Sequence, residues 1–224
     1  MVKTLAYIKN LEVRQSEGDF LKCLNESARN IITPRDEAYV RLQTRDRENI
    51  GRRYGTWTSA GFEYVREQLP ILRLESRLLD LELARQAVEA NKRGKYFHTS
   101  NTDEYEDSLK QAKKDKNKKP SERKVIILPS RGNFKISEKE NWEVLEALLK
   151  DQARPYFELN GPITVYPVDK KDVDSQNGTL LTQLCFRHFD IRSGFDDYLG
   201  FCAMIIVRVG YFEKTGEAGR TREK

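Results

Sequence analysis

Cysteine is scarce in this chain. The 224 residues include three cysteines, Cys23, Cys185 and Cys202, and no CxxC pair. An odd number of scattered cysteines argues against a disulfide framework and is typical of a reducing compartment. Alternation along the expected strand at 179–189 places Leu181 and Cys185 on one face, and Leu180, Leu184 and His188 on the other. A thiolate metal site is therefore disfavoured, because Cys185 and His188 point in opposite directions. We therefore expect buried structural cysteines and no bound metal.

Long apolar runs and nucleotide-binding loops are missing as well. No stretch approaches the ~18 consecutive apolar residues of a membrane span, and the start, MVKTLAYIKN, has no apolar signal-peptide segment. The stretch GRRYG lacks the Lys-Ser/Thr ending of a phosphate-binding loop, and WTSAG is not a G-x-S-x-G nucleophile motif. The sequence thus predicts a cytoplasmic, non-catalytic protein without a membrane segment or a cofactor.

What the chain has in quantity is charge. Charged residues make up 33% and hydrophobic residues 38%, and Lys and Arg outnumber Asp and Glu by 40 to 35, which gives a net charge of +5. A charged surface over a modest core is typical of a folded domain with 10% aromatic residues. The mild basic excess permits an anionic partner without requiring one.

The apolar spacing predicts an α+β fold with a helix-rich N-terminal half. The strongest helical pattern covers residues 72–90, and Asn101 with Glu104 predicts a capping box at the start of a second helix. The stretch EAYVRLQT alternates like a half-exposed strand, although Pro34 before it allows a helix instead.

The second half is richer in strands. Apolar runs begin at Ile163, Thr179 and Gly200, and a helix that carries Trp142 precedes them. We expect these strands to form an antiparallel β-meander with the helix packed on one face. The predicted organisation is an α+β helix-rich region at 1–112, a Lys-rich linker or loop at 113–124, the meander with its helix at 125–213, and a flexible tail at 214–224.

Arginine and aromatic residues alternate in the stretch RDRENIGRRYGTW. Arginine neutralises phosphate, and tyrosine or tryptophan stacks on unpaired bases, so this mixture suits RNA or single-stranded DNA. The alternative is a hairpin whose arginines pair with neighbouring carboxylates and whose tryptophan fills the core. The candidate nucleic-acid-binding residues of this segment are Arg45, Arg47, Arg52, Arg53, Tyr54 and Trp57.

A second basic segment, KKDKNKKPSERK, has no apolar residue and contains Pro120. It is either a solvated linker or an arm that adds salt-sensitive, sequence-independent affinity for nucleic acid. The candidate residues here are Lys113, Lys114, Lys116, Lys118 and Lys119.

The acidic stretch DIRSGFDD offers a competing interpretation. Asp190, Asp196 and Asp197 resemble a magnesium site for phosphoryl transfer, but adjacent aspartates beside Ser and Gly are also typical of turns. We expect a non-catalytic subunit that binds RNA or single-stranded DNA within a larger assembly of protein subunits. The alternatives are a protein-interaction subunit that uses the apolar face of residues 72–90, and a magnesium-dependent nuclease.

Overall fold

The computed structural model describes residues 3–8, 11–17, 21, 24–25, 31–43, 56–175, 177–188, 193–196 and 208–214. The strands are β1 (Lys3–Ile8), β2 (Leu11–Glu17), β3 (Thr56–Val65), β4 (Ile71–Arg73), β5 (His98–Thr99), β6 (Val125–Ile127), β7 (Phe134–Ile136), β8 (Ile163–Tyr166), β9 (Thr179–His188), β10 (Ser193–Asp196) and β11 (Arg208–Lys214). The α-helices are α2 (Pro34–Gln43), α4 (Leu81–Lys92), α5 (Asp103–Asp115), α6 (Trp142–Leu149), α7 (Ala153–Asn160) and α8 (Lys170–Asp174), and the 3₁₀-helices are η1 (Arg77–Leu79), η2 (Pro120–Glu122) and η3 (Lys150–Gln152).

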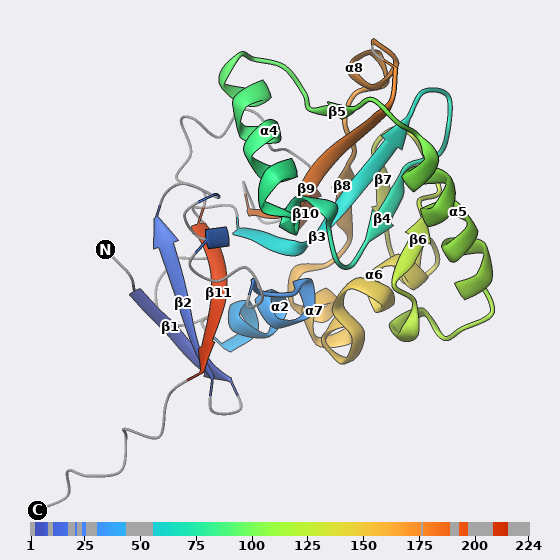
Figure 1. Cartoon of the computed structure of the whole chain (residues 1–224). Coiled ribbons are helices and arrows are strands. Elements are labelled where there is room, and N and C mark those ends of the chain that lie inside the picture. Colours follow the sequence, from blue (N-terminus) through green and yellow to red (C-terminus); the bar gives the residue numbers. More distant parts are fainter. Residues whose placement is uncertain are drawn as a thin grey trace, which may run out of the picture.

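Strands from both halves of the chain join one sheet (Figure 1). Its main path runs β1-β2-β11-β3-β9-β10-β8-β7, and β4, β5 and β6 attach beside it. The central pair is β3 with β9, which is antiparallel from Thr56 opposite Phe186 to Val65 opposite Thr179. Helices combined with a mainly antiparallel sheet confirm the predicted α+β class.

The order of the late strands differs from the expected meander. Strand β10 lies between β8 and β9, and β3 lies between β9 and β11. The reason is that part of the acidic stretch, which we expected to be a loop, forms β10 and pairs antiparallel with β9. Strand β10 therefore pairs with the backbone N–H and C=O groups along one edge of β9. In a meander that follows the order of the chain, β8 would have paired with that edge.

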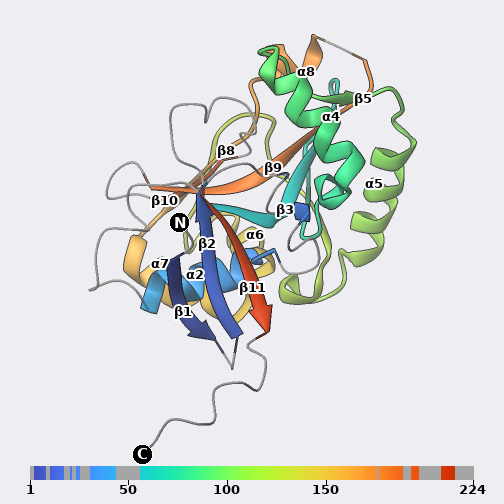
Figure 2. The same ribbon diagram turned by 60° about the vertical axis from the view of Figure 1, so that its left-hand side comes forward.

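The sheet is covered on both faces. Helices α2, α6 and α7 pack on one face, and their core includes Leu145 and Tyr156 together with Leu180 and Leu184 of β9. Helix α4 lies over the opposite face, where Leu181 of β9 points. The alternation predicted for β9 is therefore confirmed. Figure 2 shows β1, β2 and β11 side by side at the end of the sheet away from α5.

Three local predictions are wrong. Residues 72–90 do not form one helix, because β4, η1 and α4 share that apolar stretch. Residues 37–43 are helical and not a strand, since Pro34 opens α2 and Arg41 pairs with Glu37 one turn earlier at 2.7 Å. The reciprocal capping box at Asn101 does not form: the Asn101 amide oxygen accepts the backbone N–H of Asp103, but Glu104 pairs with Arg77 and does not reach back to Asn101.

The Lys-rich run is ordered and not a structureless linker. It comprises the end of α5, a turn and η2, and it leads directly into β6. Because β6 pairs with β4, strands on both sides of the run are neighbours in the same sheet. Whether 1–112 and 125–213 fold as separate units stays a prediction. The tail beyond Lys214 lies outside the described residues.

Candidate functional site

Five lysines cluster where α5 ends, and we call them the lysine corner: Lys113, Lys114, Lys116, Lys118 and Lys119. The first two belong to the last turn of α5, and the others follow in the turn before η2. All five side chains are exposed. The structure therefore places all five predicted residues, exposed, within one short segment between the last turn of α5 and η2.

Asp115 fixes the turn from inside. Its side chain is 0% exposed and accepts the Lys118 ammonium at 2.7 Å. It also accepts the Gln111 amide at 2.8 Å and the backbone N–H of Lys124 at 3.4 Å. These hydrogen bonds, led by that from Lys118, lower the pKa of Asp115 despite its burial. The one carboxylate within the lysine corner is thus turned inward, and Lys118 is partly committed to it.

Arg123 holds the turn from the other side. Its guanidinium donates to the carbonyl oxygens of Lys118 at 3.2 Å and Lys116 at 2.9 Å, and to the Glu143 carboxylate of α6 at 2.7 Å. The side chain of Arg123 is only 15% exposed. Because the two carbonyls are satisfied, the negative end of α5 is compensated and the lysine ammonium groups are left to face solvent.

Four of the five lysines keep their charge unneutralised. Within the described residues, Lys113, Lys114, Lys116 and Lys119 take part in no ion pair, unlike Lys118. Four such charges within seven residues produce a positive potential that favours a polyanion. The sequence did not reveal Asp115, Arg123 and Glu143 as the residues that order this surface. Asp115, which interrupts the run of lysines, was the one sign in the sequence that this segment folds into a turn.

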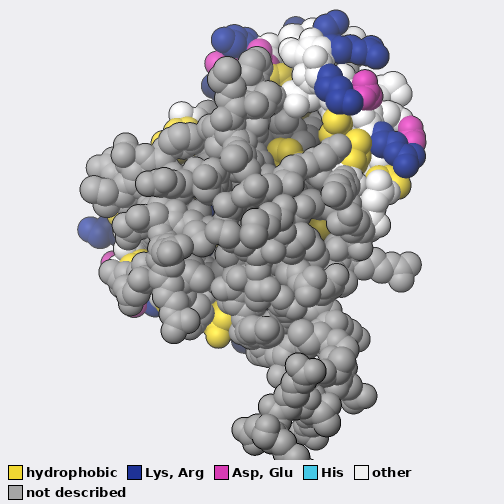
Figure 3. All heavy atoms as spheres, turned by 90° about the vertical axis from the view of Figure 1, so that its left-hand side faces the viewer, with side chains coloured by type: hydrophobic (Ala, Val, Ile, Leu, Met, Phe, Trp, Pro, Cys, Tyr) yellow, Lys and Arg dark blue, Asp and Glu magenta, His cyan; other side chains and the backbone are white. Residues whose placement is uncertain are grey.

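A second basic group is less favourable. Figure 3 shows Lys and Arg side chains at the upper end of the face that lies on the left in Figure 1. Figure 1 places α4 and α8 at the upper end of the molecule. Lys92, Arg93 and Lys95 are exposed where α4 ends, and Lys170 and Lys171 are exposed where α8 begins. Two of them are offset by carboxylates, since Lys92 pairs with Glu89 at 2.7 Å and Lys171 approaches Asp169 at 3.8 Å. This group serves better as a control surface.

The arginine–aromatic segment has a different outcome. Arg45, Arg47, Arg52, Arg53 and Tyr54 lie outside the described residues. Trp57 is described, is 8% exposed and packs in the core beneath α4. It is therefore not available to stack on a base. Its burial agrees with the alternative in which this tryptophan fills the core, whereas the hairpin and its arginine pairs lie outside the described residues.

The acidic stretch supplies no metal site that can be described. Asp190 and Asp197 lie outside the described residues, and Asp196 belongs to β10, opposite Cys185 of β9 and Tyr166 of β8. Within the part of the chain that the structure describes, no three His, Cys, Asp or Glu residues gather as metal ligands. The magnesium-dependent nuclease stays an untested alternative.

The apolar face expected to bind a protein partner is used inside the fold. Leu72 and Leu78 are buried in the two cores on either side of the sheet. Leu81 and Leu83 of α4 pack against the second core and are only partly exposed. The protein-interaction alternative therefore loses the surface on which it rested. Among the described helices, none combines the length and apolar character that crossing a bilayer requires.

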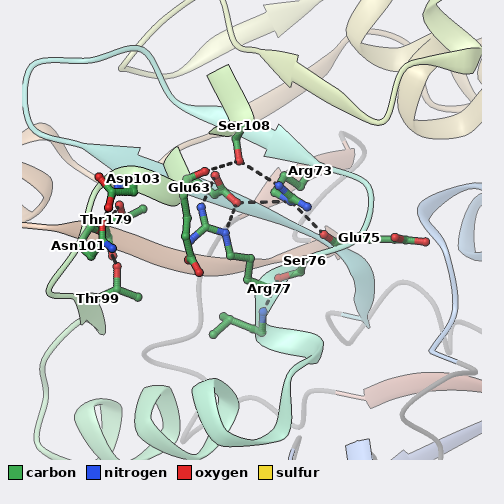
Figure 4. A network of polar contacts seen from close by, with 12 residues as sticks. Glu63, Arg73, Glu75, Ser76, Arg77, Thr99, Asn101, Asp103, Ser108 and Thr179 are labelled. Carbon is green, nitrogen blue, oxygen red and sulfur yellow. Dashed lines mark hydrogen bonds and ion pairs between the residues drawn. The ribbon is translucent and has the colours of Figure 1, made fainter. Parts of the chain in front are cut away.

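A buried ionic cluster lies between β3, β4, η1 and α5 (Figure 4). Glu63 of β3 is 2% exposed and contacts Arg77 at 2.9 Å and Arg73 at 3.4 Å. Arg77 also pairs with Glu104, and Arg73 donates to the Ser108 hydroxyl at 2.9 Å. The two arginines and two glutamates balance one another, so this cluster offers no net charge to a ligand and serves to join α5 to the sheet.

His98 of β5 should make stability depend on pH. Burial lowers the pKa of its imidazole below 6.5, and neither ring nitrogen has a hydrogen-bond partner within the described structure. The unfolded chain therefore binds the proton more readily, so stability is full above pH 6.5 and falls as the pH is lowered through that value. We expect urea midpoints to fall less between pH 8 and pH 5.5 in His98→Gln than in the unmodified protein. Parallel curves would contradict this assignment.

Comparisons with known proteins add a fold but no family. No family model matches the chain, and no curated protein matches it. A solved structure described as "Accommodation of massive sequence variation in Nanoarchaeota by the C-type lectin fold" aligns with a TM-score of 0.51 and 12% identity, over 95% of this chain and 96% of that one. The chain thus has a C-type lectin-like α+β fold. At this identity the likeness concerns the fold alone.

Proposed function

We propose that this protein binds RNA or single-stranded DNA without catalysing a reaction, and that the lysine corner contacts the phosphate backbone. The observation that carries the proposal is a set of four exposed lysines that pair with no carboxylate among the described residues, on a turn that Asp115 and Arg123 hold in place. A surface arranged before binding loses less conformational entropy on binding than a flexible arm would.

Phosphate contact explains what kind of recognition to expect. Residues 113–124 contain no aromatic side chain, so the lysine corner cannot stack on bases. Each lysine that neutralises a phosphate releases counterions, and for single strands the logarithm of the affinity falls by about 0.7 per contact against the logarithm of the salt concentration. The binding that we propose is therefore salt-sensitive and tolerant of sequence.

The setting of this function is also part of the proposal. We place the protein in the cytoplasm, because the chain has only three cysteines, an odd number without a CxxC pair. We further propose that it acts beside other protein subunits. The description of the structurally similar protein says that the C-type lectin fold accommodates massive sequence variation. For a fold of this kind, the binding surface has to be located from this chain's own residues.

Removing four charges from the lysine corner tests the proposal. We expect replacement of Lys113, Lys114, Lys116 and Lys119 by glutamine to weaken binding of a labelled 20-nucleotide RNA or DNA strand by about 10- to 100-fold at low salt. The slope of the logarithm of the affinity against the logarithm of the salt concentration should become shallower by about 3. Lys118 is kept because it holds Asp115. Fluorescence anisotropy across a salt series measures both quantities, and the melting temperature should stay unchanged.

The matched control removes four charges elsewhere. Lys92, Arg93, Lys95 and Lys170 belong to the second basic group and are also exposed. Their replacement by glutamine changes the net charge by the same amount, so any effect of overall charge appears in both variants. Equal losses in the two variants, or no loss in either, would overturn the assignment to the lysine corner.

A further inference from the structure

Lys150 has a backbone conformation that suits glycine. It joins α6 to η3 with φ 53° and ψ −122°. For a residue with a Cβ atom this combination is strained, and it is the conformation that glycine supplies in type II′ turns. Asn141, at the other end of α6, has φ 58° and ψ 19°, which is the ordinary left-handed region that asparagine tolerates. The fold alone therefore favours glycine at position 150.

The place of Lys150 links it to the lysine corner. Helix η2 directly follows the lysine corner and contacts η3, whose first residue is Lys150. The side chain of Lys150 is exposed. Arg123, which fixes the turn before η2, donates a hydrogen bond to Glu143 in the first turn of α6. Lys150 follows the last residue of the same helix. The same short helix therefore supports both basic sites.

The charge of Lys150 is not cancelled by the residue beside it. Asp151 accepts two hydrogen bonds from Arg35 of α2, at 2.6 Å to Oδ1 and 2.8 Å to Oδ2. These bonds lower the pKa of Asp151 to about 2, so this carboxylate is fully ionised and committed to Arg35. Among the described residues, Lys150 takes part in no ion pair.

We infer that Lys150 is an additional phosphate-binding residue, which extends the lysine corner across η2 into a longer track for a single nucleic-acid strand. This inference rests on the proposed function. It explains why a residue that strains the backbone occupies a position where glycine would be stabilising: the ammonium group contributes to binding, and η3, which begins at Lys150, contacts η2.

The inference predicts opposite effects on stability and binding. We expect Lys150→Gly to raise the melting temperature by about 3 °C, because the strain is relieved. The same change should weaken binding of a labelled 20-nucleotide RNA about 3- to 5-fold and flatten the salt dependence by about 0.7, because one phosphate contact is lost. Thermal unfolding and fluorescence anisotropy on the full chain measure the two effects separately.

Two further variants separate charge from backbone. Lys150→Ala should weaken binding as much as the glycine variant without the rise in melting temperature, and Lys150→Arg should keep the affinity. Lys95→Ala removes one exposed charge from the second basic group and should leave binding almost unchanged.

The possible failures can be distinguished. If the unmodified protein binds RNA and the glutamine variant of the lysine corner weakens it, but the Lys150 variants bind normally, the inference on Lys150 is wrong and the proposed function stands. Equal weakening in the arginine and alanine variants would also overturn a role for the charge. If the unmodified protein binds no RNA or single-stranded DNA, both proposals are wrong.

Discussion

Replacing Glu63 by alanine should lower the free energy of unfolding by about 3–5 kcal/mol. Glu63 is 2% exposed and is the shared partner of Arg77, at 2.9 Å, and Arg73, at 3.4 Å. Removing it leaves guanidinium charge in a largely buried place without its counterion, and desolvation already lowers the pKa of Arg77. Urea denaturation at pH 7 measures the change.

Two variants set the scale for this result. Glu63→Gln keeps hydrogen-bond acceptance but not the charge, so we expect a smaller loss. Glu104→Ala removes the other carboxylate that meets Arg77, but that side chain is 56% exposed and should contribute less than about 1 kcal/mol. A loss below about 1 kcal/mol in Glu63→Ala would show that the cluster does not hold α5 on the sheet.

Gly61→Ala should destabilise the protein by about 3 kcal/mol, because β3 passes very close to two neighbours at this residue. A Cβ atom at Gly61 would lie 2.6 Å from the carbonyl oxygen of Thr182 and would also overlap the Ser76 hydroxyl. That hydroxyl accepts the backbone N–H of Leu78 at the start of η1, so moving it breaks a second interaction.

The control for this prediction is Gly132→Ala. A Cβ atom there would meet only the Ser130 hydroxyl, at 3.8 Å, which is an ordinary contact. We expect its unfolding free energy to stay within about 0.5 kcal/mol of the unmodified protein. The double variant Gly61→Ala, Ser76→Gly should recover only part of the loss, because the Thr182 carbonyl remains. Full recovery would contradict the assignment to the backbone contact.

The sequence was most informative where one strong periodicity acts alone. The alternation in β9 correctly predicted which side chains enter each core, since a central strand buried on both sides has little freedom in register. It failed for residues 72–90, where leucines from a strand, a 3₁₀-helix and an α-helix together imitate a single helical face. Periodicity cannot separate short adjoining elements that face the same core.

Local signals outside the periodicity were also informative. The hydroxyl of Thr33 accepts the backbone N–H of Asp36 at 3.2 Å, which caps α2, and the sequence Thr-Pro-Arg-Asp marks such a start. Pro155 lies in the first turn of α7, where its missing N–H has no cost. If Thr33 and Pro155 had been given more weight than the alternation of apolar residues, the sequence would have predicted the starts of α2 and α7.

For the candidate site, the sequence located the lysines but not what orders them. Arg123 reaches back to two carbonyl groups and across to Glu143, 20 residues later in the chain. Such long-range hydrogen bonds have no signature in a charge run, which reads the same whether it is a solvated linker or a folded turn. Lys150 was missed for a similar reason, because only the backbone angles distinguish it from other surface lysines.

The pairing of β2 with β11 determines when this sheet can be completed during synthesis. Leu11–Glu17 lies antiparallel to Arg208–Lys214, so two of the most distant segments of the chain are hydrogen-bonded neighbours. Strand β2 emerges from the ribosome long before its partner and must wait, with β1, for β11 to arrive. Among the described strands, the β1–β2 hairpin reaches the rest of the sheet through β11. This connection therefore has to wait for the translation of β11, and until then one edge of β2 lacks that partner.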